Sequence, residues 1–196
     1  MSTLVTKEAP DFTATAVMAD DSFEEITLSS YRGKYVVLFF YPLDFTFVCP
    51  SEIIAFDKAL DKFKSRNAEL IGVSIDSKFS HLAWKNTPVN KGGIGQIQYP
   101  LVADLNKRIA KDYEVLLNKS IALRGLFLID KEGTIRHATI NDLPLGRNVD
   151  EVLRMIDAVQ QNDEHGEVCP ANWTKGDDTM VQTADSVAGY LAKHAS

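Results

Sequence analysis

An unbroken apolar segment at residues 35–41, with the sequence YVVLFFY, constrains the fold more than any other part of the chain. It is rich in β-prone residues and ends at Pro42, which predicts a central strand covered on both faces. Residues 50–66 follow, where apolar side chains recur at three- and four-residue steps, as in an amphipathic helix. A buried strand that leads directly into such a helix predicts an α/β fold.

The later elements continue this alternation. Strands are predicted at residues 69–75, 100–103, 125–129 and 134–140, and helices at 80–86, 105–112 and from 148 or 150 to 162. Asp76 or Ser77 is the expected cap of the helix at 80–86, and residues 130–133 read as a hairpin turn. We therefore predict a core domain over residues 1–162, built on a mostly parallel sheet. Residues 163–196 show little periodicity before a short helix at 185–193, which predicts an extended C-terminal arm.

A lone cysteine, Cys49, stands where the first strand gives way to the helix. The unpaired N–H groups and partial positive charge of a helix start can lower a cysteine pKa from about 8.5 into the ~3.5–7.5 range, so we expect a thiolate. Thr46 lies three residues earlier, where its hydroxyl can donate to the sulfur. Pro50 suits the first helical position, which predicts that Cys49 is the N-cap residue. The simpler alternative for Cys49 is a buried structural thiol.

Composition excludes several functions. The net charge is −6 and the pI is near 5.2, so the chain has no general attraction to nucleic acid or anionic lipid. It shows no apolar run of membrane-spanning length and no signal peptide, from which we expect a cytoplasmic protein. The four histidines lack paired ligand spacing, so we expect packing or solvated histidines and no metal. Gly92-Gly93-Ile94-Gly95 lacks the spacing of a nucleotide-binding loop, so no cofactor is expected.

Four blocks of sequence resemble the typical two-cysteine peroxiredoxins. The first is residues 39–52, FFYPLDFTFVCPSE, which holds Pro42, Thr46 and Cys49 in the family's spacing. The others are RGLFLID at 124–130, PLGRNVDE at 144–151 and VCPANW at 168–173, in the family's order. The resemblance covers nearly the whole chain. It implies a thioredoxin-like fold, with a central mixed sheet flanked by helices, and a peroxidase that needs no bound cofactor.

The resemblance also implies roles for residues outside the cysteine loop. Arg124 opens a strand, where an arginine has no packing reason to be, and the family match places its guanidinium beside Cys49. Its alternative is a surface cation or a partner in a salt bridge. The resemblance assigns Glu52 and Arg147 to holding this arginine and the pocket, or else they are simply solvated. It assigns Pro42, otherwise a strand terminator, to shielding the thiolate from water.

The second cysteine, Cys169, lies 169 − 49 = 120 positions from the first, so the two form no local Cys-x-x-Cys pair. Spacing alone leaves its partner open. By resemblance Cys169 resolves the sulfenic acid on Cys49 as a disulfide between subunits of a dimer, and such dimers form decameric rings. The oxidised enzyme would then be regenerated by thioredoxin or by a dedicated flavoprotein disulfide reductase.

One block departs from the family. Its members pair a Gly-Gly-Leu-Gly loop with a C-terminal Tyr-Phe, and together these slow the unfolding that joins the cysteines. Here the loop has Ile94 and the tail has Tyr190-Leu191, so an aromatic anchor is lost and the sensitivity to over-oxidation is open. Two other function classes compete with a peroxidase. A disulfide oxidoreductase would need a second cysteine beside Cys49, and a non-catalytic chaperone module would not need Thr46 and Arg124.

Overall fold

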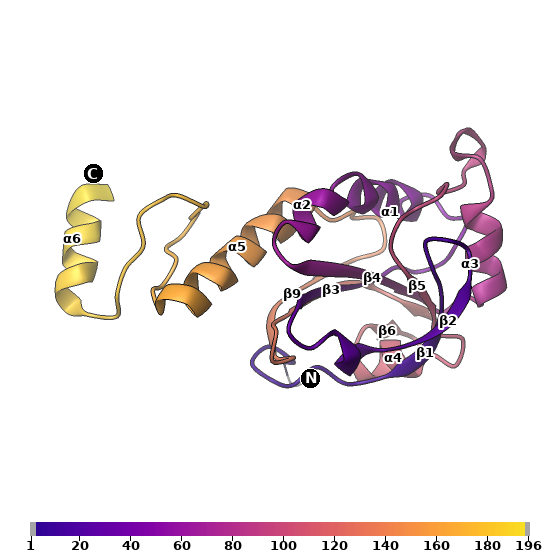
Figure 1. Cartoon of the computed structure of the whole chain (residues 1–196), viewed down its shortest axis with the longest axis horizontal. Coiled ribbons are helices and arrows are strands. Elements are labelled where there is room, and N and C mark those ends of the chain that lie inside the picture. The colour runs from indigo at the N-terminus through magenta and orange to yellow at the C-terminus, as the bar shows by residue number, and fades with distance from the viewer. Residues whose placement is uncertain (1–2, 195–196) are drawn as a thin grey trace. The chain divides into compact units, whose positions relative to one another are not determined.

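A seven-stranded mixed sheet forms the core of the protein in the computed structural model, which describes residues 3–194 (Figure 1). The strand order is β2-β1-β5-β4-β3-β8-β9, and only the β3–β4 and β4–β5 pairs are parallel. The strands are β1 (Thr13–Val17), β2 (Phe23–Thr27), β3 (Tyr35–Phe40), β4 (Ala68–Ser74), β5 (Leu101–Ala103), β8 (Arg124–Ile129) and β9 (Ile135–Asn141). A separate hairpin joins β6 (Leu116–Leu117) to β7 (Ile121–Ala122). The predicted mixed sheet is confirmed, whereas the expectation of a mostly parallel one is wrong.

The central strand β3 has all six residues buried, because its two faces pack against different helices. Phe39 stacks on Phe56 of α1 (Cys49–Lys58), with 4.6 Å between ring centroids. Its neighbour Phe40 points to the opposite face and lies 5.3 Å from Tyr113, beside α4 (Arg108–Asp112). Successive side chains of a strand alternate between faces, so a strand with two packed faces needs apolar residues throughout. Figure 1 shows α1 and α4 on opposite sides of the sheet.

The helices differ from the prediction at their ends. The expected helix at 50–66 is divided at Ala59 (φ −94°, ψ 3°) into α1 and α2 (Leu60–Lys64). The helix at 105–112 begins only at Arg108, because Lys107 has a φ of +62° that an α-helix does not accommodate. Ser77 caps α3 (Lys78–Lys85) through the N–H of Ser80, which confirms one of the two expected caps.

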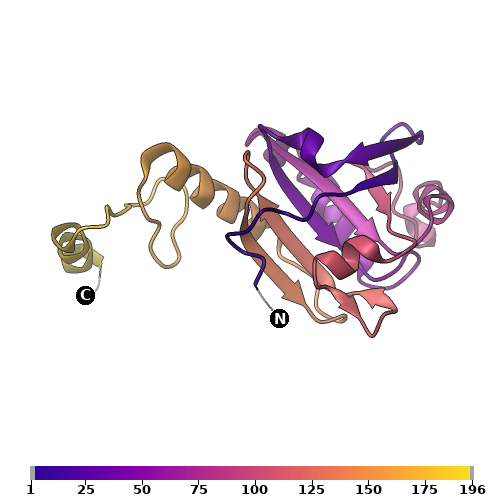
Figure 2. The same cartoon turned by 90° about the horizontal axis from the view of Figure 1, so that it is seen from below.

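The sequence did not predict β1 and β2, the antiparallel pair at one edge of the sheet. Of their ten residues only Ala16, Val17 and Ile26 are buried, so their apolar pattern is weak. The predicted hairpin at the other edge is present as β8 and β9. Its turn contains Gly133 with a φ of +87°, a conformation that glycine adopts without strain. Figure 2 shows the indigo β1 and β2 and the orange-pink β9 at opposite edges.

Contacts between residues divide the chain into two units, Met1–Val149 and Asp150–Ser196. The second unit contains most of α5 (Val149–His165) and all of α6 (Ala184–His194). Arg154 of α5 donates to the carbonyl of Trp173, so this helix shares contacts with the segment that follows it. The expected domains, 1–162 and 163–196, stay a prediction. Within residues 3–194, no helix has the length and apolar character needed to cross a lipid bilayer.

Candidate active site

Cys49 lies at the junction of loop 42–48 and α1, at the edge of the sheet where β3 ends. The residue is fully buried, and it is the first residue of the helix rather than its N-cap. Val48 takes the cap position with helical angles (φ −86°, ψ −35°), so the helix begins one residue earlier than expected. Pro50 is consequently the second helical residue, where a missing N–H is still harmless because the first four have no helical partner.

The hydroxyl of Thr46 lies 2.9 Å from Sγ of Cys49 and 2.8 Å from the carbonyl oxygen of Leu43. One hydroxyl proton faces two acceptors. With Cys49 as a thiol, the S–H can donate to Oγ1 while the hydroxyl donates to Leu43. With Cys49 as a thiolate, the hydroxyl proton turns to the sulfur. Thr46 therefore accommodates both protonation states of the cysteine without moving.

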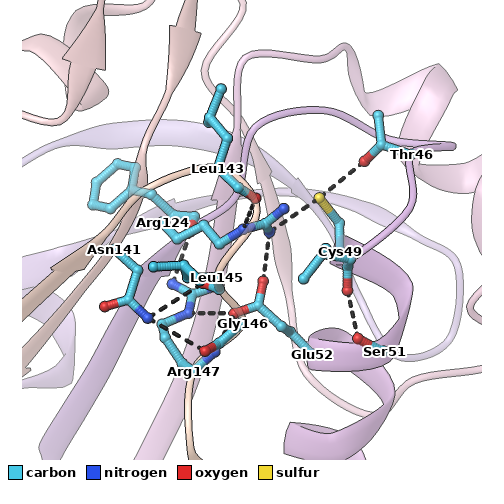
Figure 3. A network of polar contacts seen from close by, with 12 residues as sticks. Thr46, Cys49, Ser51, Glu52, Arg124, Asn141, Leu143, Leu145, Gly146 and Arg147 are labelled. Carbon is cyan, nitrogen blue, oxygen red and sulfur yellow. Dashed lines mark hydrogen bonds and ion pairs between the residues drawn. The ribbon is translucent and has the colours of Figure 1, made fainter.

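Arg124, the first residue of β8, supplies a cation to the same sulfur (Figure 3). Its Nη1 lies 3.4 Å from Sγ of Cys49 and 2.6 Å from Oε2 of Glu52. Its Nε donates to the carbonyl of Leu143 at 2.7 Å, and the residue is only 3% exposed. The guanidinium is thus fixed by one carboxylate and one carbonyl while a remaining N–H points at the sulfur. The structure places Arg124 where the resemblance implied. The alternative of a surface cation is wrong, whereas the salt bridge that was the other alternative is present, to Glu52.

Glu52 holds two arginines at once. Its Oε1 accepts from the backbone N–H of Arg147 at 2.9 Å and from Nε of Arg147 at 2.7 Å. Nη1 of Arg147 donates to the carbonyls of Phe40 and Gly125, which fixes the segment 144–147 against the sheet. Burial lowers the pKa of Arg147, and the charge of Glu52 opposes that effect. Both side chains are at most 3% exposed, so the alternative that they are solvated is wrong.

Cys169 belongs to the second unit and is only partly buried. Its Sγ lies 3.6 Å from the carbonyl oxygen of Ala158 on α5, as expected for a weak S–H donor. Burial raises the pKa of this thiol, Arg154 lowers it and Glu167 adds to the rise. Cys169 is therefore a less activated nucleophile than an ordinary thiol. Its pairing with Cys49 stays a prediction, since both cysteines are free in this structure.

Two other expectations stay predictions as well. Pro42 is buried at the start of the loop, a position compatible with shielding the sulfur. The loop with Ile94 and the tail with Tyr190 lie in different units, so the family's contact between them is untested. Ile94 is buried in its unit, and Tyr190 stacks on His194 within its own, with 4.4 Å between ring centroids. Among residues 3–194, no cluster of three or more His, Cys, Asp or Glu side chains has the geometry to hold a metal ion.

A buried polar cluster that was not predicted from the sequence lies beside the loop. Asp44 accepts a hydrogen bond from the hydroxyl of Tyr41, and its other carboxylate oxygen lies 2.8 Å from Nδ1 of His81. His81, expected to be a packing or solvated histidine, is completely buried on α3. The backbone N–H of Asp44 donates to Asp76 at 2.8 Å. No local motif signals this cluster, because Asp44 and His81 are separated by 37 positions.

Comparison with known proteins identifies the family of this chain. Residues 5–138 match the model of the AhpC/TSA family, and residues 158–193 match that of the C-terminal domain of 1-Cys peroxiredoxin. The chain is 58% identical over 189 residues to peroxiredoxin-2 of Mus musculus, which covers 96% of this chain and 95% of that protein. It is 59% identical over 194 residues to alkyl hydroperoxide reductase C of Helicobacter pylori, which covers 98% of both.

Solved structures give the same result. The crystal structure of the reduced 2-Cys peroxiredoxin of Plasmodium vivax superimposes with a TM-score of 0.96 and 56% identity, covering 97% of this chain and all of that one. The thioredoxin peroxidase I of Plasmodium yoelii matches with a TM-score of 0.80 and 60% identity over 88% of this chain and 99% of that one. The predicted thioredoxin-like fold of the peroxiredoxins is thereby confirmed. The chain belongs to the AhpC/TSA family and is a peroxiredoxin.

Proposed function

We propose that this peroxiredoxin reduces hydrogen peroxide and small organic hydroperoxides at Cys49. The observation that carries the proposal is the pair of donors on one buried sulfur, Thr46 Oγ1 at 2.9 Å and Arg124 Nη1 at 3.4 Å. A hydroxyl and a guanidinium that converge on a sulfur favour its anionic form, the form that attacks peroxides. Thr46, Cys49 and Arg124 are accordingly the proposed catalytic residues, with Pro42 as the shield of the sulfur.

The first step transfers one oxygen atom. The thiolate attacks the terminal oxygen of the peroxide, an S–O bond forms as the O–O bond breaks, and Cys49 becomes a sulfenic acid. The electron pair of the broken bond goes to the leaving oxygen, which takes a proton and departs as water or an alcohol. Arg124 is suited to stabilise charge on that oxygen because its guanidinium is fixed before the reaction begins. Glu52 and Arg147 position it and touch no reacting atom.

The second step would involve Cys169. Its thiol attacks the sulfenic sulfur, water leaves, and a Cys49–Cys169 disulfide forms. Because Cys49 is fully buried, the loop or the helix start has to move before a second sulfur reaches bonding distance. We propose that the two cysteines come from different subunits of a dimer.

Reduction of this disulfide needs an external dithiol, since the chain has only two cysteines. We propose thioredoxin or a dedicated flavoprotein disulfide reductase as the partner. The name of one similar protein, thioredoxin peroxidase I, supports thioredoxin as the reductant. We also propose a ring of five dimers. A similar Plasmodium yoelii protein forms an artifactual octamer when its N-terminus is modified, which supports assembly beyond the dimer and leaves the number of dimers to measurement.

We propose a cytoplasmic location as well. A reducing compartment suits a protein whose cysteines must return to two thiols in every cycle. Cell fractionation tests this proposal, which fails if the protein is recovered outside the cytoplasmic fraction.

Two serine variants test the mechanism. Cys49→Ser should abolish peroxide consumption. Peroxide consumption that survives the change would rule out this mechanism. It would also remove the reason for choosing a peroxidase over a chaperone module at this site. Cys169→Ser should complete one turnover and stop at the sulfenic acid. On a non-reducing gel it should show no covalent dimer after peroxide treatment, whereas the unmodified protein should show one. A covalent dimer that persists in Cys169→Ser contradicts the resolving role.

A further inference from the structure

The segment that carries Cys169 is held on both sides of the cysteine. Before it, Val168 and Met180 exchange two backbone hydrogen bonds, of 2.8 and 3.1 Å. After it, the buried side chain of Trp173 donates from Nε1 to the carbonyl of Asp177 at 3.1 Å. A segment that is bonded at both ends presents its thiol in one position. Cys169 is therefore held by its own unit of the chain.

Arg154 is the side chain that ties this segment to α5. Its Nη1 donates to the carbonyl oxygen of Trp173 at 2.8 Å. Its Nε and Nη2 donate to the two carboxylate oxygens of Glu151 at 2.6 and 2.8 Å. Such a two-point ion pair fixes the plane of a guanidinium as well as its place. The remaining N–H consequently keeps its direction toward Trp173, four residues after the cysteine.

The same guanidinium acts on the sulfur of Cys169. The sulfur lies 3.6 Å from the carbonyl oxygen of Ala158, which follows Arg154 by one helical turn on the same face of α5. Burial raises the pKa of the Cys169 thiol, and the positive charge of Arg154 lowers it. The carboxylate of Glu167, in the segment before the cysteine, raises it further. Arg154 and Glu167 thus have opposite effects on the ionisation of one sulfur.

We infer that Arg154 is a positioning residue for the resolving step, which holds the segment of Cys169 against α5 and keeps a positive charge near its sulfur. The inference rests on the proposed function for the step that it serves. In that step Cys169 gives up its proton, and its sulfur attacks the sulfenic sulfur of Cys49. The S–S bond forms as the S–O bond breaks, and the leaving hydroxide takes a proton to become water. Because the thiolate is the attacking form, a nearby cation increases the reactive fraction.

Alkylation of Cys169 in the full-length Cys49→Ser protein measures this effect without peroxide or a disulfide. The rate with iodoacetamide is recorded as a function of pH. Arg154→Met should move this profile to higher pH, because it removes the cation. Glu167→Gln should move it to lower pH, because it removes the anion and keeps an acceptor for Thr179. A merely structural role of Arg154 predicts the opposite shift, since a loosened segment would relieve the burial that raises the pKa of Cys169.

The rate of disulfide formation after one equivalent of peroxide measures the positioning effect, in protein that retains Cys49. Arg154→Met should slow this step by a factor of about 3 to 10, as expected for one charge-assisted hydrogen bond at a partly exposed side chain. Arg154→Lys keeps the charge but cannot bind Glu151 at two points and also reach Trp173. It should keep the alkylation profile and still form the disulfide slowly. The matched control is Lys175→Met, which removes an exposed cation from the same segment and should change neither measurement.

The inference is overturned if Arg154→Met leaves the alkylation profile in place or moves it to lower pH, or if Lys175→Met moves it equally. Should circular dichroism show that Arg154→Met does not fold, Arg154→Lys decides, and a disulfide rate equal to that of the parent overturns the inference. Failure of the proposed function is recognised separately. The parent protein would then form no covalent dimer after peroxide treatment, while alkylation of Cys169 in Cys49→Ser would still respond to Arg154.

Discussion

Replacing Arg124 with methionine tests how much of the chemistry depends on one fixed cation. The change keeps a side chain of similar length and removes three hydrogen bonds, to Cys49, Glu52 and Leu143. Glu52 keeps its two bonds from Arg147, so no carboxylate is left without a partner. We therefore expect Arg124→Met to fold and to lose reactivity.

The geometry bounds the magnitude. A unit positive charge 3.4 Å from a thiolate attracts it by about 5 kcal/mol at an effective dielectric constant of ~20. The guanidinium charge is delocalised and shared with Glu52, so the net effect on the reaction is smaller. Removing one preorganised donor from a site of developing negative charge typically costs about 10²–10³ in rate, or ~2.7–4 kcal/mol. We expect the second-order rate constant of Arg124→Met for hydrogen peroxide to decrease by a factor within that range.

Two reagents separate the roles of the cation. Stopped-flow single-turnover oxidation by hydrogen peroxide measures thiolate stability together with stabilisation of the leaving oxygen. Alkylation of Cys49 by iodoacetamide involves no leaving oxygen, so Arg124→Met should slow it less than it slows oxidation. Equal losses in both reactions would restrict Arg124 to stabilising the thiolate.

The control is Arg136→Met, which removes an arginine from the neighbouring strand β9. Arg136 pairs with Asp130 at 3.3 Å and makes no contact with the sulfur. The Arg136→Met variant should retain the oxidation rate of the unmodified protein. An Arg124→Met variant that is folded and still oxidised within about threefold of the normal rate would refute the reasoning, because so small a change corresponds to less than ~1 kcal/mol of transition-state stabilisation.

Three further predictions address the network, the second thiol and the fold. Glu52→Gln leaves two buried guanidiniums without their carboxylate, so the free energy of unfolding, measured in urea, should fall by about 3–5 kcal/mol. A loss below ~1 kcal/mol would contradict a stabilising role for these two ion pairs. Because burial raises the pKa of Cys169, its alkylation in Cys49→Ser should still accelerate with pH beyond about pH 9, and a plateau at lower pH contradicts that shift. A Cβ on Gly133 would meet only the guanidinium of a partly exposed side chain, which can move aside, and Gly166 has open space at a similar positive φ. Gly133→Ala and Gly166→Ala should therefore lower the melting temperature by similar amounts through backbone strain, and a much larger loss at Gly133 would contradict this reasoning.

Parts of the fold were predictable where a single segment carries its own signal. The run at 35–41 became β3 because packing on both faces requires apolar residues in sequence, and the hairpin at 130–133 followed from its glycine. The strands β1 and β2 were missed because an edge pair with mostly exposed residues has no such run. The late start of α4 depends on Lys107, whose left-handed conformation leaves no mark in the sequence.

The site divides in a similar way. Thr46 and Cys49 are three residues apart at a helix start, so local geometry alone predicts their contact. Arg124 lies 75 positions from Cys49, and only the resemblance placed it beside the sulfur. The contact between Asp44 and His81 was not predicted, because it depends on how the loop after β3 packs against the helix after β4 across adjacent parallel strands. Residue spacing carries no information about such packing.

The charges around Cys49 connect the two halves of the proposed cycle. Arg124 and Arg147 bring two positive charges into a buried site and Glu52 brings one negative charge, so the site is neutral only when Cys49 is a thiolate. Oxidation to the uncharged sulfenic acid leaves one positive charge uncompensated. Burial already disfavours a cation there, since it lowers the pKa of Arg147. Formation of the sulfenic acid therefore weakens the electrostatic contacts between Cys49 and the two arginines, at the stage when Cys49 has to leave its pocket. The packed site is most stable in the reduced thiolate state, before peroxide binds.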